Sequence, residues 1–557
     1  MVRFKTLGSV LSLALMICNF GVGPAWCQDQ QPAPAETTAP AAATTPAEVA
    51  VAQAEPETQV NAATQEQTAK PEASAPETQK KPFDPFDFLV YKPLWTITRW
   101  IGGFNPIGKG ISTPLENAIP GLRVKGFINN ITQVNTTGNS SDAGLGGRLK
   151  DWRLQKEEER VQLELRYQAN ENIEFVSVEN GYVDGAYALG HSSGLYNSGA
   201  GSQEYYTQGK RILREEYIRG NYGFFNFTLG KQIINWGKMD GKVTDIINAS
   251  DERDVVDFHA GDYEWRAIGQ WMANVSFRPT ATTTINLVWN PDFQPDRNPA
   301  PGSAWWYPFA PSAPAGTLGL AEVRPSGLSR LSDSEEGVRV AQTIGALTLS
   351  GIYYYGFDRD YVYFTSDNKL HYTRLPKTGY ALDYGTHIGK QRFIFRSEGL
   401  VTLGKAYQIG DPTLSNGIEK KNLGTLAVAV ETSIFSDANR INIEYQPELV
   451  HQFGYDPRTA VAYPGTGAAR NDITQVIDIN HTIRKTADKL GLDATFYINA
   501  GGSVYGGWAA NYAATWNFSD FVQAKLAYND YQGGVADLPW GAYRRWRNVT
   551  LDVKYEF

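Results

Sequence analysis

Hydrophobic and polar residues alternate along the end of the chain, from Trp546 to Phe557. The apolar positions are Val549, Leu551, Val553, Tyr555 and Phe557, and the polar positions between them are Asn548, Thr550, Asp552, Lys554 and Glu556. Because successive side chains of a strand point to opposite faces, this segment is predicted to have one apolar face and one charged face. An apolar outside around a polar inside is typical of a β-barrel that crosses a membrane.

The same alternation recurs earlier in the chain. Val161, Leu163, Leu165 and Tyr167 alternate with Arg160, Gln162, Glu164, Arg166 and Gln168, and Ile441, Ile443, Tyr445 and Leu449 alternate with Arg440, Asn442, Glu444, Gln446 and Glu448. A charge that faces lipid at mid-membrane costs about 2–4 kcal/mol, so the restriction of charge to one face predicts a wet interior.

The connections between these strands predict the topology. Short turns are expected at 169–172, 221–223, 279–282, 345, 389–390, 436–439, 485–489 and 518–520, and long loops at 135–157, 183–210, 235–265, 292–336, 357–378, 402–421, 453–471, 501–506 and 531–544. Short turns of such barrels are periplasmic and long loops extracellular. We therefore predict an all-β, transmembrane, antiparallel up-and-down barrel of about eighteen strands over residues 123–557. Weak patterns near Arg123 and Gly337 leave about sixteen strands as the alternative.

The N-terminal part has a different composition. Arg3 and Lys5 precede an apolar stretch from Leu7 to Phe20, which predicts a cleaved signal peptide over residues 1–27. Both cysteines, Cys18 and Cys27, lie within it, so the mature chain has no thiol for disulfides or metal ligation. Residues 28–82 are rich in Ala, Pro and Thr and predict a disordered periplasmic linker. Residues 83–122 predict a short helical or plug-like segment.

Charge and candidate chemistry narrow the classes of function. The net charge of −8, which becomes −10 without Arg3 and Lys5, argues against a nucleic-acid partner. None of the six histidines lies near a Gly-x-Ser-x-Gly or His-Glu-x-x-His motif, so we expect no catalytic residues, no metal site and no cofactor. A lipid-acting enzyme, with His481 on the lipid-facing side of its strand, is the less favoured alternative.

Two long loops hold the candidate binding residues. The loop at 235–265 carries Asp240, Asp245, Asp251, Asp254 and Asp257; folded into the lumen, these acids would face the wall residues Arg160, Arg166, Arg278, Arg392, Arg396, Arg440 and Arg484. Such opposed charges create a transverse field and narrow a pore. The alternative is an exposed acidic loop, with the arginines paired to neighbours such as Glu164, Glu398 and Glu444. The loop at 292–336 carries Trp305, Trp306, Tyr307 and Phe309, which could dock an apolar or sugar-like ligand, form a lid or pack together.

Two stretches resemble known patterns. The ending with Val553, Tyr555 and Phe557 resembles the terminal-strand signal of Gram-negative outer-membrane barrels, which implies recognition by the barrel-assembly machinery. Gly230 to Gly237, with Arg214 to Gly220 before it, resembles a family of such barrels known as a domain of unknown function, whose hallmark is Gly-Arg-Gln-x-x-x-Trp-Gly. The likeness extends from Arg211 to Asp292, with Lys231 in place of the arginine.

The resemblance implies a porin-like barrel that handles hydrophobic or lipid-like compounds, often beside an inner-membrane exporter. From the residues, we expect Gly230 and Gly237 to let the strand bend as it leaves the wall and Trp236 to act as a wedge. The predicted function is passive diffusion of small solutes across the Gram-negative outer membrane, in contact with phospholipid and lipopolysaccharide. The alternative is a structural barrel that tethers the envelope, through residues 28–82, to the cell wall or an inner-membrane transporter.

Overall fold

The computed structural model describes most of the chain after Lys92. The described residues are 92–101, 103, 105–136, 154–188, 212–239, 243–254, 257–258, 266–297, 320–327, 330–409, 414–435, 439–456, 470–483, 489–499, 507–533 and 540–557. The predicted signal peptide and linker, residues 1–82, lie outside this part of the chain.

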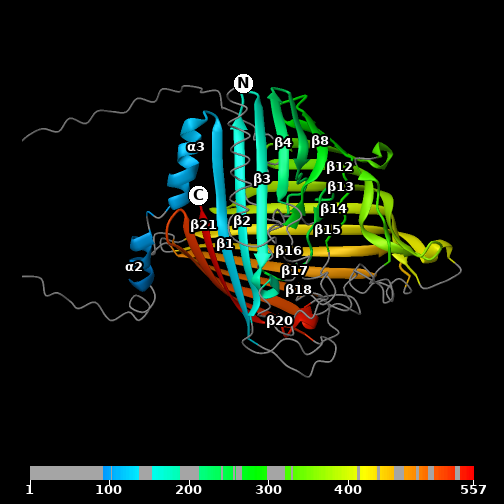
Figure 1. Ribbon diagram of the computed structural model, residues 1–557. Helices are drawn as coiled ribbons and strands as arrows, with labels where there is room; N and C mark the ends of the chain where they lie inside the picture. Colours follow the sequence, from blue (N-terminus) through cyan, green and yellow to red (C-terminus); the bar gives the residue numbers. More distant parts are fainter. Residues whose placement is uncertain are drawn as a thin grey trace, which may run out of the picture.

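Eighteen antiparallel strands within the described residues form one closed sheet (Figure 1). They are β1 (Leu122–Asn135), β2 (Leu154–Gln168), β3 (Ile173–Asp184), β4 (Leu213–Tyr222), β5 (Phe225–Gln232), β8 (Gln270–Phe277), β9 (Thr283–Asn290), β11 (Glu335–Ile344), β12 (Leu347–Phe364), β13 (Lys369–Ile388), β14 (Gln391–Gln408), β15 (Ile418–Phe435), β16 (Asn439–Phe453), β17 (Asn471–Ile483), β18 (Leu490–Asn499), β19 (Trp508–Asn517), β20 (Val522–Gln532) and β21 (Asn548–Glu556). The prediction of about eighteen strands is confirmed, and the alternative of sixteen is wrong.

Sequential neighbours pair around the ring, and the two ends of the chain close it. β1 pairs with β2 on one side and with β21 on the other, in a register that joins Phe127 to Glu556 and Asn135 to Asn548. Beyond β21, the Phe557 amide donates to the Gly126 carbonyl at 2.9 Å, and the Gly126 amide donates to the Phe557 carbonyl at 3.0 Å. The sheet therefore has no free edge along this seam.

Short elements lie outside the ring of strands. β6 (Ala249–Ser250) pairs with β7 (Ala267–Ile268), and β10 (Glu322–Val323) runs parallel to β13. The helices are α2 (Lys92–Ile101), η2 (Gly108–Ser112), α3 (Thr113–Ala118), α4 (Gly185–Ala188), η5 (Leu331–Asp333), η6 (Ser415–Gly417) and η8 (Trp540–Tyr543). In the described part of the chain, no helix combines the length and the apolar character needed to cross a membrane.

The alternation of polar and apolar residues has the predicted effect on burial. In β2, Arg160, Gln162 and Glu164 are buried toward the inside, whereas Leu551 and Val553 of β21 are exposed on the outside. Exposed aromatic and branched side chains continue around the outer face, among them Trp271, Leu287, Tyr380, Tyr445, Tyr512 and Leu526. The fold is therefore a transmembrane barrel with an apolar outside and a polar inside.

Two predicted loop boundaries are wrong. Residues 357–378 form mainly the ends of β12 and β13, which are joined only by 365–368, and residues 402–421 include the ends of β14 and β15. The alternation is interrupted there because the pairing is irregular: register shifts occur between Phe357 and Tyr361 and between Thr402 and Lys405. A β-bulge places two residues opposite one and breaks the sequence period without ending the strand.

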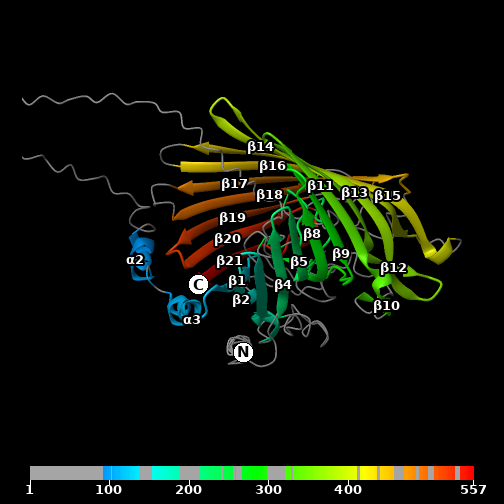
Figure 2. The same cartoon turned by 90° about the horizontal axis from the view of Figure 1, so that it is seen from above.

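The segment before β1 packs against the outer side of the barrel, near the C-terminus (Figure 2). The Trp516 indole donates to the Thr98 hydroxyl in α2 at 2.8 Å. The Tyr555 hydroxyl donates to the Asn105 side chain at 2.8 Å and accepts from the Ile107 amide at 3.1 Å. Because Trp516 and Tyr555 share the outward rows of Tyr512 and Val553, these contacts hold the segment on the outside instead of in the pore mouth.

Candidate functional site

The chain leaves the barrel wall after β5 and returns to it at β8, and the residues between, 233–269, are here called the inserted loop. Its start depends on Gly230, whose φ is +132° and where an added β-carbon would lie 2.8 Å from the Tyr217 α-carbon and still closer to the Glu216 carbonyl oxygen. A side chain at this position would collide with β4, so glycine is required. The side-chain amide of Gln232 donates to the Met272 carbonyl at 2.9 Å and holds the last residue of β5 against β8.

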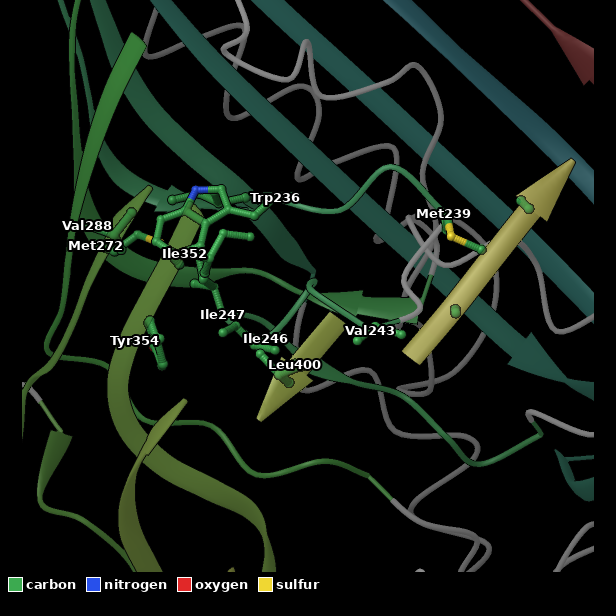
Figure 3. Packing of buried hydrophobic residues seen from close by; sticks show 13 residues of the cluster. Trp236, Met239, Val243, Ile246, Ile247, Met272, Val288, Ile352, Tyr354 and Leu400 are labelled. Atoms are coloured by element: carbon green, nitrogen blue, oxygen red, sulfur yellow. The ribbon is translucent and has the colours of Figure 1, made fainter. Parts of the chain in front are cut away.

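An apolar cluster packs the inserted loop against the inside of the wall (Figure 3). Trp236 is 2% exposed and meets Tyr354 of β12 edge to face, with ring centroids 6.4 Å apart. Gly337 of β11 leaves room for both rings, since a β-carbon there would lie 2.7 Å from each. The other members are Ile234, Met239, Val243, Ile246, Ile247, Met272, Val288, Ile352, Leu400, Ala427 and Ala429. Apolar residues that face inward from β12, β14 and β15 thus pack against the loop.

Glu398 of β14 binds the backbone of the inserted loop. Its buried carboxylate accepts hydrogen bonds from the amides of Lys238, Val243 (3.1 Å) and Thr244 (2.9 Å). Gly237 fits there for lack of a side chain, because a β-carbon would lie 2.5 Å from the Asp245 carboxylate and 3.0 Å from that of Glu398. Gly237 therefore serves the close approach of the two carboxylates, and the bend predicted for it stays a prediction.

Replacement of Glu398 by alanine is expected to loosen the inserted loop. It leaves three loop amides without their acceptor, at a cost of roughly 1–3 kcal/mol for each buried donor. We expect noisier single-channel currents and faster proteolysis within residues 238–265. Glu431→Ala, at a β15 carboxylate that binds Arg396 and no loop amide within the described residues, is the matched control. Identical noise and cleavage in the two variants would contradict this role of Glu398.

The loop acids pair mainly with cations other than the predicted arginines. Asp254 and Asp257 lie 2.6 and 2.8 Å from Lys156 of β2, and the Gln133 side chain of β1 donates to Asp257 at 2.8 Å. Asp251 binds Arg253 at 2.5 Å and Arg297 at 3.3 Å.

Of the remaining predicted acids, Asp245 accepts from the Gly237 amide at 2.6 Å, and Asp240 lies outside the described residues.

The predicted wall arginines separate into several environments. Arg160 pairs with Glu158 and Arg166 with Glu164, both within β2. Arg278, Arg392 and Arg440 lie at strand ends beside short turns, and Arg484 lies outside the described residues. Individual pairings therefore follow the alternative arrangement, with neighbouring glutamates as partners. The predicted role of these residues in narrowing a pore stays a prediction.

Arg396 of β14 lies among acids from three neighbouring strands. Its guanidinium lies 2.8 Å from Glu431 of β15, 3.3 Å from Glu444 of β16 and 3.9 Å from Asp383 of β13. These side chains are 21–35% exposed, whereas Arg160 and Glu164 of β2, across the barrel, are buried. The lumen thus has a covered side and an open, charged side.

The inserted loop also reaches the opposite wall. The Phe258 ring packs on Tyr497 of β18 at 5.5 Å and on Tyr531 of β20 at 6.0 Å. Arg253 binds the hydroxyl of Tyr182 in β3. Together with the cluster on β12, β14 and β15, these contacts carry the loop across the lumen.

Sequence reasoning missed Lys156, Arg359 and Arg339, the last of which is buried near Asp245 and Glu398. It named Glu398 only as a partner for the wall arginines. The signal for Lys156 was its place beside the acidic run Glu157 to Glu159. Arg359 follows a register shift, where the period fails, and binds Glu335 at 2.8 Å. Nothing in the sequence near Arg339 or Glu398 distinguishes them from other inward charges.

The remaining predicted residues are at the ends of the barrel or outside the described part. Tyr555 and Phe557 lie at the closing seam, and Val553 faces outward on the same row. Trp305, Trp306, Tyr307 and Phe309 lie outside the described residues. Within the described residues, no group of three or more His, Cys, Asp or Glu side chains is placed to hold a metal ion.

A cavity of about 210 Å³ lies between the inserted loop and the wall of β12 and β13. Its lining is unusually rich in charge: Asp245, Ile246, Asn248, Ser250, Glu252, Arg266, Asp296, Asp358, Arg359, Asp360 and Lys377.

The chain belongs to the DUF1302 family, described as a protein of unknown function, whose model matches residues 35–327. That match includes the stretch from Gly230 to Gly237, which begins the inserted loop. No curated protein matches the sequence significantly.

Several solved porins have a similar arrangement of strands. The BenF-like porin from Pseudomonas fluorescens Pf-5 is 6% identical, with a TM-score of 0.43 over 79% of this chain and 98% of that one. Pseudomonas aeruginosa OccK2 in complex with glucuronate is 8% identical, with a TM-score of 0.46 over 79% and 98%. Acinetobacter baumannii OccAB3 is 7% identical, with a TM-score of 0.47 over 79% and 100%. The assignment of the barrel fold rests on the strand pairing described above.

Proposed function

We propose that the protein is an outer-membrane channel through which small polar solutes diffuse passively. The observation that carries the proposal is a closed barrel whose lumen the inserted loop crosses while the charges around Arg396 stay partly exposed. A barrel of this size has room for an aqueous path beside the loop. The exposed charges of Asp383, Arg396, Glu431 and Glu444 border that path.

Charge on the open side favours hydrated solutes over the hydrophobic compounds that the family resemblance implied. Moving an apolar molecule past ionised side chains strips water from them without replacing their hydrogen bonds. The apolar cluster of the inserted loop offers no alternative path, because its members are buried against the wall. The outer face supports a location in the outer membrane, since its exposed aromatic residues suit contact with lipid.

The test is single-channel recording of the refolded protein in a planar bilayer, with the reversal potential measured in a salt gradient. Stable open steps are expected, with cation preference, because three carboxylates surround Arg396. A protein that is folded by heat-modifiable electrophoresis but gives no steps would overturn the proposal. Arg396→Gln is expected to increase the cation preference, and Arg330→Gln, on an exposed loop, serves as its control.

A further inference from the structure

The wall of the charged cavity is shaped by a bulge in β12. Regular pairing between β12 and β13 stops at Phe357 and resumes at Tyr361. In a regular strand, consecutive residues point to opposite faces, yet Asp358 and Arg359 both line the cavity. Bulges re-aim side chains in this way and are enriched beside functional sites.

Most charges around the cavity already have partners of opposite sign. Asp358 and Asp360 lie 2.8 and 3.4 Å from Lys405. Arg359 binds Glu335 at 2.8 Å and donates to the Ile247 carbonyl at 2.6 Å. Glu252 binds Arg266 at 3.2 Å. These pairs fix the geometry of the lining, and because Asp358 and Asp360 share Lys405 they leave one net negative charge.

Two lining residues of opposite charge, Lys377 and Asp296, form no such ion pair within the described residues. The ammonium group of Lys377, half-buried on β13, has no hydrogen bond or ion pair with any residue in the described ranges. Asp296 accepts one hydrogen bond, from the Ser250 amide at 2.7 Å, and has no ion-pair partner within the same ranges. Asp358 and Arg359 both influence Lys377, whereas Asp360, Glu252 and Arg359 influence Asp296. The two uncommitted charges therefore line the same cavity.

We propose that this cavity binds a small dipolar solute, with its anionic group at Lys377 and its ammonium group at Asp296. The solute class is a zwitterion such as an amino acid. The inference rests on the proposed channel function and adds a solute preference to it. A singly charged ligand would leave the other half-buried charge without a partner, which is unfavourable. The volume of about 210 Å³ is below the roughly 300–1,000 Å³ of pockets for drug-sized ligands, which points to a small solute.

The probe for this proposal is 4-aminobutyrate, with butyrate and butylammonium as the singly charged controls. In single-channel recordings, 4-aminobutyrate is expected to cause partial, concentration-dependent blocks of the current. The two controls should require roughly tenfold higher concentrations, because each satisfies only one charge. Equal block by all three compounds would overturn the proposal.

Substitutions assign the two ends of the solute. Lys377→Met and Asp296→Asn keep the side-chain size, and each should weaken the block by 4-aminobutyrate roughly tenfold. Lys377→Arg keeps the charge and should retain most of the block. Lys525→Met removes a cation of β20 that does not line the cavity, and it should leave the block unchanged. An unchanged block in both Lys377→Met and Asp296→Asn would contradict the assignment.

The pH dependence provides a separate readout for Asp296. Burial, with Asp360 and Glu252 nearby, raises the pKa of Asp296 to about 7, against the lowering effects of the Ser250 amide and Arg359. Above that pH the carboxylate is ionised and attracts an ammonium group; below it, the neutral acid does not. Since 4-aminobutyrate does not titrate between pH 6 and pH 8, its block should be stronger at about pH 8 than at about pH 6. Asp296→Asn should abolish this difference.

Failure of the channel and failure of the subsite give different results. Open steps in salt alone, without selective block, would leave the channel intact and reject the subsite. Folded protein without open steps would reject the channel; calorimetric titration of that protein in detergent with 4-aminobutyrate would then decide the subsite. Binding that Lys377→Met weakens would support the subsite, and no binding would reject it.

Discussion

Replacing residues 238–264 by a short Gly-Ser linker is expected to raise the single-channel conductance several-fold. The inserted loop contacts β12, β14 and β15 on one side and β1, β2, β18 and β20 on the other, so it occupies much of the cross-section. An eighteen-stranded barrel without such a filling has an aqueous channel, and conductance rises with the open area. The same change should weaken ion preference, because ions would pass farther from the wall charges.

The matched control removes residues 189–207, from the connection between β3 and β4, and inserts the same linker. That variant also has a loop segment replaced by the linker, and its conductance should stay close to that of the unaltered protein. Both variants must be folded by heat-modifiable electrophoresis before recording. If removal of the inserted loop left conductance and ion preference unchanged, the loop would not restrict the path of ions.

Truncation after Arg547 is expected to prevent formation of the barrel. The last strand pairs with β1 from Asn135 to Phe127 and with β20 from Asn529 to Val522. Its loss exposes the backbone groups of two strands to hydrocarbon, where each unpaired group costs several kcal/mol. We expect no heat-modifiable band on refolding and no channel activity.

Two other variants change the ends of the chain but keep every strand of the barrel, so they serve as comparisons for the truncation. Removal of residues 1–82, which lie before the described part, should leave a barrel that still folds. Phe557→Ala keeps the backbone pair with Gly126 and should slow refolding without abolishing it. Normal refolding of the chain truncated after Arg547 would show that β1 and β20 can close the ring without β21.

Strand number and facing could be predicted because the membrane imposes a local rule. Each strand must present apolar residues to lipid, so Val161 and Leu551 reveal their orientation from the alternation alone. The rule fails over residues 357–378, where β12 ends later and β13 begins earlier than the alternation predicts. The irregular pairing between Phe357 and Tyr361 interrupts the alternation there. Strand continuity there depends on pairing with a neighbour, which a single sequence does not display.

The interior could be predicted only in part, because its contacts join residues far apart in the chain. The acidic loop after β5 was recognisable from composition, and Gly230 and Trp236 marked its start. Its partners were not recognisable: Glu398 binds backbone amides, which carry no sequence signature. Lys156 differs from other inward cations in its ion pairs with loop acids, and Lys377 in having no ion pair within the described residues. Neither difference is visible in the sequence.

The path of the inserted loop has a mechanical consequence for the ring. A closed sheet of many strands can flatten into an ellipse with little change in its hydrogen bonds, because each pair of neighbours needs to bend only slightly. The loop joins nearly opposite arcs, at Glu398 on β14 and at Lys156 on β2, and acts as a cross-brace along that diameter. Lateral pressure from the bilayer then meets a stiffened cross-section, so the aperture beside the loop keeps its shape as the surrounding membrane changes.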